Sequence, residues 1–170
     1  MFEAFDASAS ALRSERVRLT VIANNLANTH TTRNEYGERE AFRRKLVVFK
    51  PGNEENANPR LGVDVDEIVS DNAAPQLVYD PTHPDRIRPA DLFEAGKDGK
   101  VTTNRLPKYA KLSEEEWGRE LRKIDYVEYP NVDPVKEFGD AVLAARAYEA
   151  NVTVVEVSKR LLGETLSIIA

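Results

Sequence analysis

The sequence predicts an α+β protein in which long N- and C-terminal helices form an antiparallel, coiled-coil-like pair, with a small β-rich domain between them. Two observations predict this fold. Apolar residues recur at spacings of seven at both ends of the 170-residue chain, and eight of its nine prolines lie between those ends. We therefore expect an N-terminal helix within residues 1–30, a middle domain over 31–132 and a C-terminal helix within 133–170.

The N-terminal segment carries one apolar stripe. Its members lie seven residues apart, with one more residue three positions after the third: Phe5, Leu12, Leu19, Leu26 and Ile22. A spacing of seven, rather than the 3.6 of an isolated amphipathic helix, favours coiled-coil packing. This stripe predicts a helix that packs against another helix.

The C-terminal segment carries two interleaved heptad rows. Asp133 is suited to cap the helix and Pro134 to its first position. The rows are Phe138, Ala145, Val152, Lys159 and Leu166, and Ala141, Tyr148, Val155, Leu162 and Ile169. Only Lys159 is not apolar, and it either snorkels or sets the register. At ~1.5 Å per residue this helix reaches about 50 Å.

The middle domain reads as short strands with long loops. Alternating and β-branched residues predict strands over 42–49, 61–69 and 76–79. Within it, residues 86–124 include a short helix near 113–124. Ser113 and Glu116 form a capping box at its start, and Trp117 docks it.

The composition and the absence of known motifs argue against several classes of function. The net charge is −5 and there is no cysteine, whereas phosphate binding needs clustered Lys and Arg and many zinc sites need thiolates. No Gly-rich phosphate loop, nucleophile elbow or His-Glu-x-x-His motif is present. We expect no catalytic residue, no cofactor, no metal and no nucleic-acid partner.

One histidine invites a chemical interpretation. His83 lies between Asp80 and Asp85, an arrangement compatible with a metal or acid–base cluster. The neighbouring Pro81 and Pro84 favour a rigid turn instead, and we expect the turn.

Neither a secretory signal nor a membrane span is expected. The first residues lack the cationic segment and apolar core of a cleaved signal. No run approaches the roughly 20 apolar residues that cross a bilayer. We expect no direct membrane insertion, and export by another route if the chain leaves the cytoplasm.

The C-terminal helix has more apolar surface than one partner helix covers. Its surplus residues lie off the main rows: Val135, Val142, Val154 and Leu161. Helices from other subunits would cover them. A self-contained helical hairpin remains the alternative, and the pattern alone does not separate the two.

Three asparagines in five positions are unusual in a helix. Asn24, Asn25 and Asn28 flank Leu26, although asparagine amides compete with the helix for backbone groups. Directional hydrogen bonds to neighbouring helices would explain them, and so would a frayed helix end.

These asparagines also carry a resemblance to a known family. Ala23-Asn24-Asn25-Leu26-Ala27-Asn28 and its following Thr-containing turn, the segment Leu77–Pro84, and Tyr126–Val135 with Ala145–Val152 closely resemble the flagellar axial proteins. That family comprises rod, hook and hook-junction subunits. The last pair of segments is similar to proximal rod components. The resemblance covers residues 5–84 and 125–168.

The resemblance implies a structural role. Members are exported unfolded by the flagellar type III apparatus without a cleaved signal, and they polymerise into a hollow tube with the terminal helices inside. A rod of this kind lies in the basal body, lines the export channel and transmits torque. The partners implied are other copies of the chain, other rod proteins, the inner-membrane ring and the export-gate junction, with no small-molecule substrate.

We expect the following residues to pack subunits together: Phe5, Leu12, Leu19, Ile22, Asn24, Asn25, Leu26, Asn28, Phe138, Tyr148, Asn151, Val152, Val155 and Leu162. Residues 86–124 depart from the family pattern and carry ten Lys or Arg against seven Asp or Glu. We expect them to form a surface elaboration of the middle domain, and the sequence does not identify the partner that it contacts. The alternatives are another axial protein, a cell-wall-acting enzyme of the rod region, which would need a paired acid and base, and a cytoplasmic coiled-coil adaptor.

Overall fold

A computed structural model describes residues 2–52, 62–95 and 101–169 and confirms the α+β class. In chain order the elements are α1 (Phe2–Ala27), β1 (Lys45–Pro51), β2 (Val63–Ser70), β3 (Gln76–Tyr79), the 3-10 turn η1 (Pro89–Asp91), β4 (Phe93–Ala95), β5 (Val101–Arg105), the 3-10 turn η2 (Pro107–Tyr109), α2 (Glu114–Leu121), β6 (Tyr126–Tyr129) and α3 (Pro134–Ile169). They form two compact units. The first contains α1, β1, β2 and α3, and the second contains the loop from His30 to Phe42 and the remaining elements.

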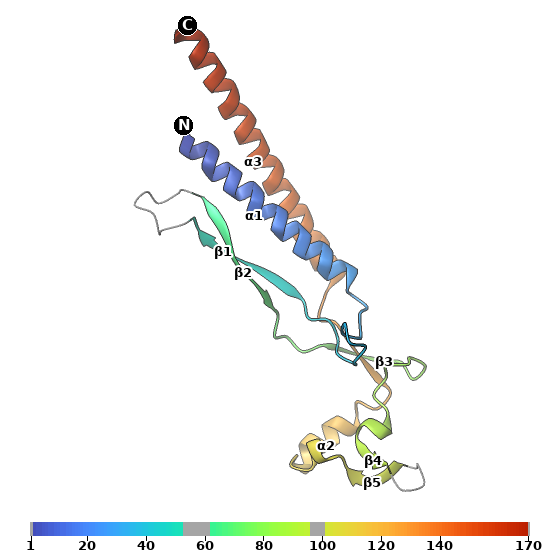
Figure 1. The fold of residues 1–170 in the computed structure, drawn as a ribbon. Coiled ribbons are helices and arrows are strands. Elements are labelled where there is room, and N and C mark those ends of the chain that lie inside the picture. The colour runs from blue at the N-terminus through green and yellow to red at the C-terminus, as the bar shows by residue number, and fades with distance from the viewer. Residues whose placement is uncertain (1, 53–61, 96–100, 170) are drawn as a thin grey trace. The chain divides into compact units, whose positions relative to one another are not determined.

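The two terminal helices run antiparallel in the first unit (Figure 1). α1 has 26 residues with no glycine or proline, and α3 has 36. The predicted start of α3 is confirmed, because the Asp133 carboxylate accepts a hydrogen bond from the Val135 N–H at 2.9 Å and Pro134 is the first helical residue. Each helix therefore has local signals that agree with its heptad pattern.

An antiparallel hairpin of β1 and β2 packs along α1 (Figure 1). Two of the predicted strands are confirmed, shifted by a few residues. The Ser14 hydroxyl donates to the Val63 carbonyl at 2.9 Å, and the Val63 N–H donates to the Ser10 hydroxyl at 3.1 Å. Small hydroxyl side chains on α1 thus satisfy backbone groups at the start of β2.

The first turn of α3 buries a charged residue. Glu137 is fully buried, whereas Phe138, the first residue of the predicted row, is 62% exposed. Two side chains from elsewhere in the unit, Asn25 and Arg44, hydrogen-bond to the Glu137 carboxylate. These contacts turn Glu137 inward, and Phe138 follows it one residue later on a different face of the helix.

The second unit holds two small antiparallel sheets and the short helix α2. β3 pairs with β6, and β4 pairs with β5. β3 matches the predicted strand over 76–79, whereas β4, β5 and β6 were not predicted. The predicted short helix is confirmed with its capping box, and Trp117, Leu92 and Val127 are buried.

Candidate assembly surface

The outward face of α3 carries a continuous apolar row. Its residues follow one another at alternating spacings of four and three: Leu143, Ala147, Ala150, Val154, Val157 and Leu161. The four large side chains are exposed, with Val154 at 45% and Leu143 at 60%. This spacing is that of a coiled-coil seam. We call this set the outer row, and it gives α3 a second seam besides the one toward α1.

A second apolar group lies at the start of α3. Val135, Phe138 and Val142 are spaced by three and four, so they share one face. They are 80%, 62% and 53% exposed. Two of them, Val135 and Val142, were expected from the sequence to lie off the main seam. Contiguous exposed apolar residues of this kind mark sites of protein–protein contact.

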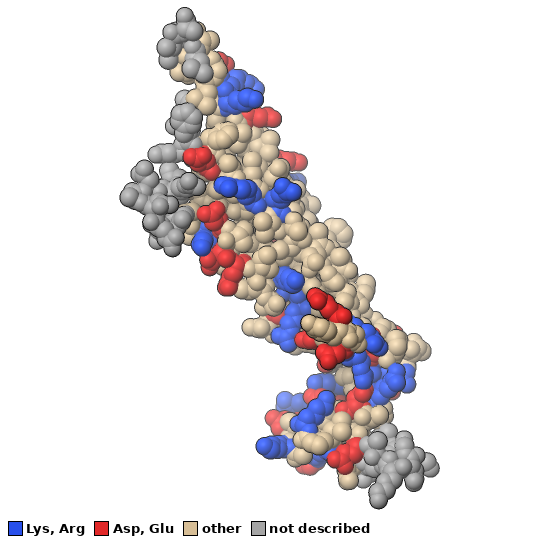
Figure 2. All heavy atoms as spheres, viewed as in Figure 1, with Lys and Arg blue, Asp and Glu red and all other residues tan. Residues whose placement is uncertain are grey.

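The solvent-exposed face of α1 is mainly polar. Its exposed side chains include Asp6, Arg13, Arg16, Thr20 and Asn24. Figure 2 shows uncharged surface along the two long helices, interrupted by a few charged side chains. The free apolar surface of the helix pair, as far as the described residues show it, is therefore mainly on α3.

The predicted packing residues fall into three groups by exposure. Ile22 and Asn25 are buried; Leu12, Leu19, Leu26, Asn28, Asn151, Val152, Val155 and Leu162 are half-buried; Phe5, Asn24, Phe138 and Tyr148 are exposed. Residues of the half-buried group keep part of their surface for a further neighbour. The exposed ones need such a neighbour if they are to be buried at all.

The asparagines divide between two roles. Asn25 is 1% exposed; its amide donates to the Lys45 carbonyl at 2.8 Å and to Glu137 at 3.1 Å, and its oxygen accepts from the Lys45 N–H. It therefore links α1 to β1 and α3 within one chain. The amide of Asn28 donates to the Asn24 carbonyl, and that of Asn151 to the Ala147 carbonyl, each within its own segment.

Charged side chains of three segments complete this link. The Arg44 guanidinium donates to the Glu137 carboxylate at 2.5 Å and to Asp140 at 3.3 Å. Arg18 of α1 lies 3.9 Å from Asp140. A buried carboxylate is costly unless it is paired and hydrogen-bonded, and Glu137 is both.

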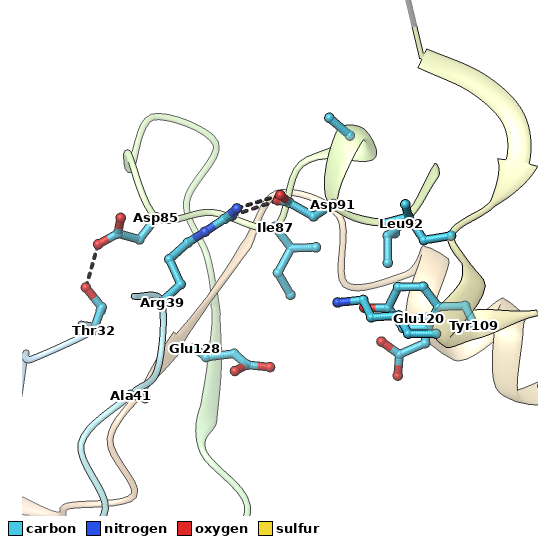
Figure 3. A pocket seen from close by; sticks show the side chains of 13 residues that line it. Thr32, Arg39, Ala41, Asp85, Ile87, Asp91, Leu92, Tyr109, Glu120 and Glu128 are labelled. Carbon is cyan, nitrogen blue, oxygen red and sulfur yellow. Dashed lines mark hydrogen bonds and ion pairs between the residues drawn. The ribbon is translucent and has the colours of Figure 1, made fainter. Parts of the chain in front are cut away.

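The second unit contains an open cleft of about 410 Å³ (Figure 3). Thr32 donates to Asp85 at 2.7 Å on one side of it, and Arg39 donates to Asp91 at 2.7 Å on the other. Asp85 also accepts from the Arg33 guanidinium at 2.9 Å. The two aspartates of the lining, Asp85 and Asp91, are thus held in ion pairs.

These pairs set the chemistry of the cleft. The hydrogen bond from Arg33, with a further one from Thr32, holds the pKa of Asp85 below its usual value although burial opposes this. Burial raises the pKa of Asp91, but hydrogen bonds from Arg39 and the Arg88 backbone outweigh it, and the net pKa is lowered. A general acid needs a raised pKa, so both carboxylates are poorly suited to that role.

Within residues 2–52, 62–95 and 101–169, no cluster of three or more His, Asp or Glu side chains is placed to hold a metal ion. His83 lies in a turn, where its ring nitrogen accepts from the Asp85 N–H at 3.1 Å. None of the helices in the same ranges combines the length and apolarity that crossing a bilayer requires.

Comparison with known proteins gives two family models and several relatives. The model described as flagella basal body rod protein matches residues 5–33, and the model described as flagellar basal body rod FlgEFG protein C-terminal matches residues 125–168. Flagellar basal-body rod protein FlgC of Bacillus subtilis is 34% identical over 98% of this chain and 97% of its own length. The proteins of the same name from Borreliella burgdorferi and Escherichia coli are 31% and 30% identical over 99% and 96% of this chain, and over 97% and 94% of their own lengths.

Proposed function

The chain belongs to the FlgC family of flagellar basal-body rod proteins, and from that membership we propose how it enters the rod. It is a structural subunit of the flagellar basal body and assembles with other rod components. The proposal is that its α3 outer row receives helices of neighbouring subunits, while the α1–α3 seam holds the single chain together.

The outer row supports this proposal most directly. Val154, Val157 and Leu161 are each 45–48% exposed in the single chain. Covering the remaining surface of one such residue contributes about 1 kcal/mol, since full burial of a Val or Leu is worth roughly 1.5–3 kcal/mol. One contact of this size is weak. In a helical tube, however, every subunit contacts several neighbours, so many such contacts add together.

The middle of the outer row suits close helix packing. Ala147 and Ala150 lie between the larger Leu143 and Val154. Small side chains let helix axes approach to the short end of the usual ~8–10 Å separation. A neighbouring helix would therefore seat at the two alanines, with the larger residues on either side as knobs.

The remaining predicted packing residues extend the contact. Phe138 and Tyr148 are 62% and 37% exposed, and Phe5 on α1 is 39% exposed. We propose that other copies of the chain and other rod proteins cover them. We further propose the inner-membrane ring and the export-gate junction as partners, because the sequence resembles proximal rod components. The support for these two is the resemblance alone.

We propose no catalytic role. The cleft carboxylates Asp85 and Asp91 are ion-paired with lowered pKa values, which gives no basis for the paired acid and base of a cell-wall hydrolase. Incubation of the purified chain with peptidoglycan should release no soluble fragments. Release that disappears in an Asp85→Asn or Asp91→Asn variant would overturn this part of the proposal.

The central experiment places a charge in the outer row. A Val157→Asp variant, expressed in place of the native protein, should be made and exported but be absent from purified basal bodies, leaving the cells non-motile. The purified variant should keep the parent's helical circular dichroism, because Val157 is 46% exposed. Charge buried in an apolar contact is costly, which is the reason for the expected defect.

The matched control is Gly163→Asp. Gly163 is exposed with open space around it, lies six residues after Val157 on the same helix, and has no outer-row residue three or four positions away. It should enter rods and support swimming. Normal motility with Val157→Asp, or equal loss with both variants, would reject the outer row as the assembly surface.

A further inference from the structure

A buried polar joint connects three elements of the first unit at the start of α3. Its members are Asn25 on α1, Arg44 just before β1, and Glu137 on α3. We propose that this joint sets the axial register of α3 against α1 and the hairpin. Only the consequence for assembly rests on the proposed function; the register itself is a property of the single chain.

The joint is directional at every contact. Glu137 is 0% exposed and accepts from Asn25 through one carboxylate oxygen and from Arg44 through the other. Asn25 is in turn fixed by two hydrogen bonds to the backbone of Lys45. Arg44 also reaches Asp140, one helical turn after Glu137. Such a set of bonds is satisfied at one axial position of α3 and at no neighbouring one.

The rest of the α3 seam has few contacts that would fix the axial position of α3 against α1. Ala141 and Ala144 are small, and Ala144 is fully buried. Further along, polar side chains of α3 bond back to their own helix, as Asn151 does to the Ala147 carbonyl and Thr165 to the Leu161 carbonyl. By contrast, α1 and β2 have their own link through Ser10 and Ser14 (above). The element that needs an independent register contact is therefore α3.

The heptad repeat makes a slip of α3 a real competitor. Moving the helix by seven residues returns the same face to α1 and displaces the chain by about 10 Å. Ala144 or a residue before the helix would then oppose Asn25 and Arg44, leaving their donors without the Glu137 carboxylate. Unpaired buried donors disfavour the slipped state strongly.

This role differs from ordinary stabilisation. Buried ion pairs often add little net stability over apolar residues of similar size, while a single buried polar group in a coiled-coil seam is an established means of fixing register. Replacing the joint by apolar side chains should thus leave a helical, folded chain whose α3 occupies more than one register. The outer row would then be displaced relative to the hairpin in part of the molecules.

Spin labels measure the register directly. The chain has no cysteine, so Asp6→Cys on α1 and Lys136→Cys on α3, both at exposed positions, would carry the only two labels. Lys136 adjoins the joint and Asp6 lies 19 residues before Asn25 on α1, so the labels are about 28 Å apart along the helix axis. A slip of one heptad changes this separation by about 10 Å.

The test compares the labelled parent with Arg44→Met/Glu137→Leu in the same labelled chain. The parent should give one narrow distance, and the variant should add a second population displaced by about 10 Å, with unchanged helical circular dichroism. Lys50→Met/Asp66→Leu is the matched control, because it removes an exposed ion pair of 3.1 Å from the same unit; it should keep one distance.

A single undisplaced distance in the folded joint variant would overturn the proposal. If the double variant loses its helices, Glu137→Ala decides, because Arg44 keeps Asp140 as a partner. It should show the displaced population, and its absence would equally overturn the proposal. Since these distances are measured on the purified chain, a failure of rod assembly alone would count against the proposed function and not against the joint.

Discussion

Gly62 lies directly against Ser10. A β-carbon built on Gly62 would approach the Ser10 hydroxyl oxygen to 2.2 Å, and the backbone at Gly62 has φ +144°, a region that L-residues with side chains rarely adopt. The Ser10 hydroxyl is held in place, because it donates to the Ala7 carbonyl at 2.7 Å and accepts from the Val63 N–H. The chain therefore enters β2 against α1 at a point where only glycine fits.

Gly62→Ala should lower the free energy of unfolding of the first unit by about 1–3 kcal/mol, because it adds backbone strain and a clash. Urea unfolding followed by helical circular dichroism measures this. Gly139→Ala is the control: it lies in α3 with open space around the new carbon and should raise stability by about 0.5–1 kcal/mol. Equal stability of the parent and Gly62→Ala would contradict the close approach.

The two compact units should unfold separately when the core of the second is damaged. Trp117 is 7% exposed; its ring meets Phe93 edge-on at 5.3 Å, and the Arg105 guanidinium lies 4.7 Å above it. Trp117→Ala should cost about 3–5 kcal/mol, enough to open a unit of this size while α1 and α3 stay folded.

Amide hydrogen exchange resolves this effect by region. Protection should be lost in α2 and β6 of the Trp117→Ala variant and kept in the helix pair. Trp117→Phe, which keeps an aromatic ring in the site, should show a much smaller loss. Loss of protection in α1 and α3 to the same extent would show that the units depend on a common core.

Local signals in the sequence account for the elements that were predicted. The heptad stripes gave both long helices within a few residues of their observed ends. The Ser113–Glu116 capping box gave the start of α2, since both bonds join residues three apart. The short strand β3 was also found, because Gln76-Leu77-Val78-Tyr79 is rich in β-favouring residues between a proline and an aspartate.

The features that were missed depend on distant partners. Arg44 and Glu137 are 93 residues apart, and no periodicity connects them. Glu137 followed a capping aspartate and a proline, where an acidic residue normally faces solvent at the positive end of the helix dipole. Heptad counting therefore placed Phe138 in an apolar row and gave no role to Glu137. Similarly, β6 is a four-residue strand whose pairing with β3 is set by the fold and not by its own composition.

Acid should destabilise the second unit partly through Asp85. The hydrogen bond from Arg33 lowers the pKa of Asp85 in the folded chain from its ordinary value of 3.8. A lowered folded pKa means that its stabilisation is fully present above the unfolded pKa and is lost as the pH falls through the folded pKa. We therefore expect stability to decline below about pH 4.

Asp85→Asn should be less stable than the parent at neutral pH and should lose less stability on acidification. The fluorescence of Trp117, the only tryptophan, reports unfolding of this unit. Some acid dependence should remain, because the pKa of Asp91 is also lowered. Glu35→Gln, in an exposed loop position of the same unit, is the control, and an acid profile equal to the control's would refute the role of Asp85.

The capping box of α2 should behave as one coupled device. The Ser113 hydroxyl accepts from the Glu116 N–H at 3.3 Å, while the Glu116 carboxylate accepts from the Ser113 N–H at 3.0 Å. The bond from the Ser113 N–H, with one that the Ser113 hydroxyl donates to the Glu116 carboxylate at 2.9 Å, also lowers the pKa of Glu116. Each half orients the other, because both bonds close on the same turn.

Ser113→Ala should cost about 1 kcal/mol of stability in the second unit. Glu116→Ala should cost a similar amount, and the double variant should cost less than the sum of the two, because the second substitution removes a bond already weakened by the first. Urea unfolding followed by Trp117 fluorescence measures the stability of the parent, the two single variants and the double variant. Glu115→Ala, in the same turn, takes no part in the box and should change little. Additive losses for Ser113 and Glu116 would mean that the two bonds act independently and that the dipole of α2, not the box, accounts for its acidic first turn.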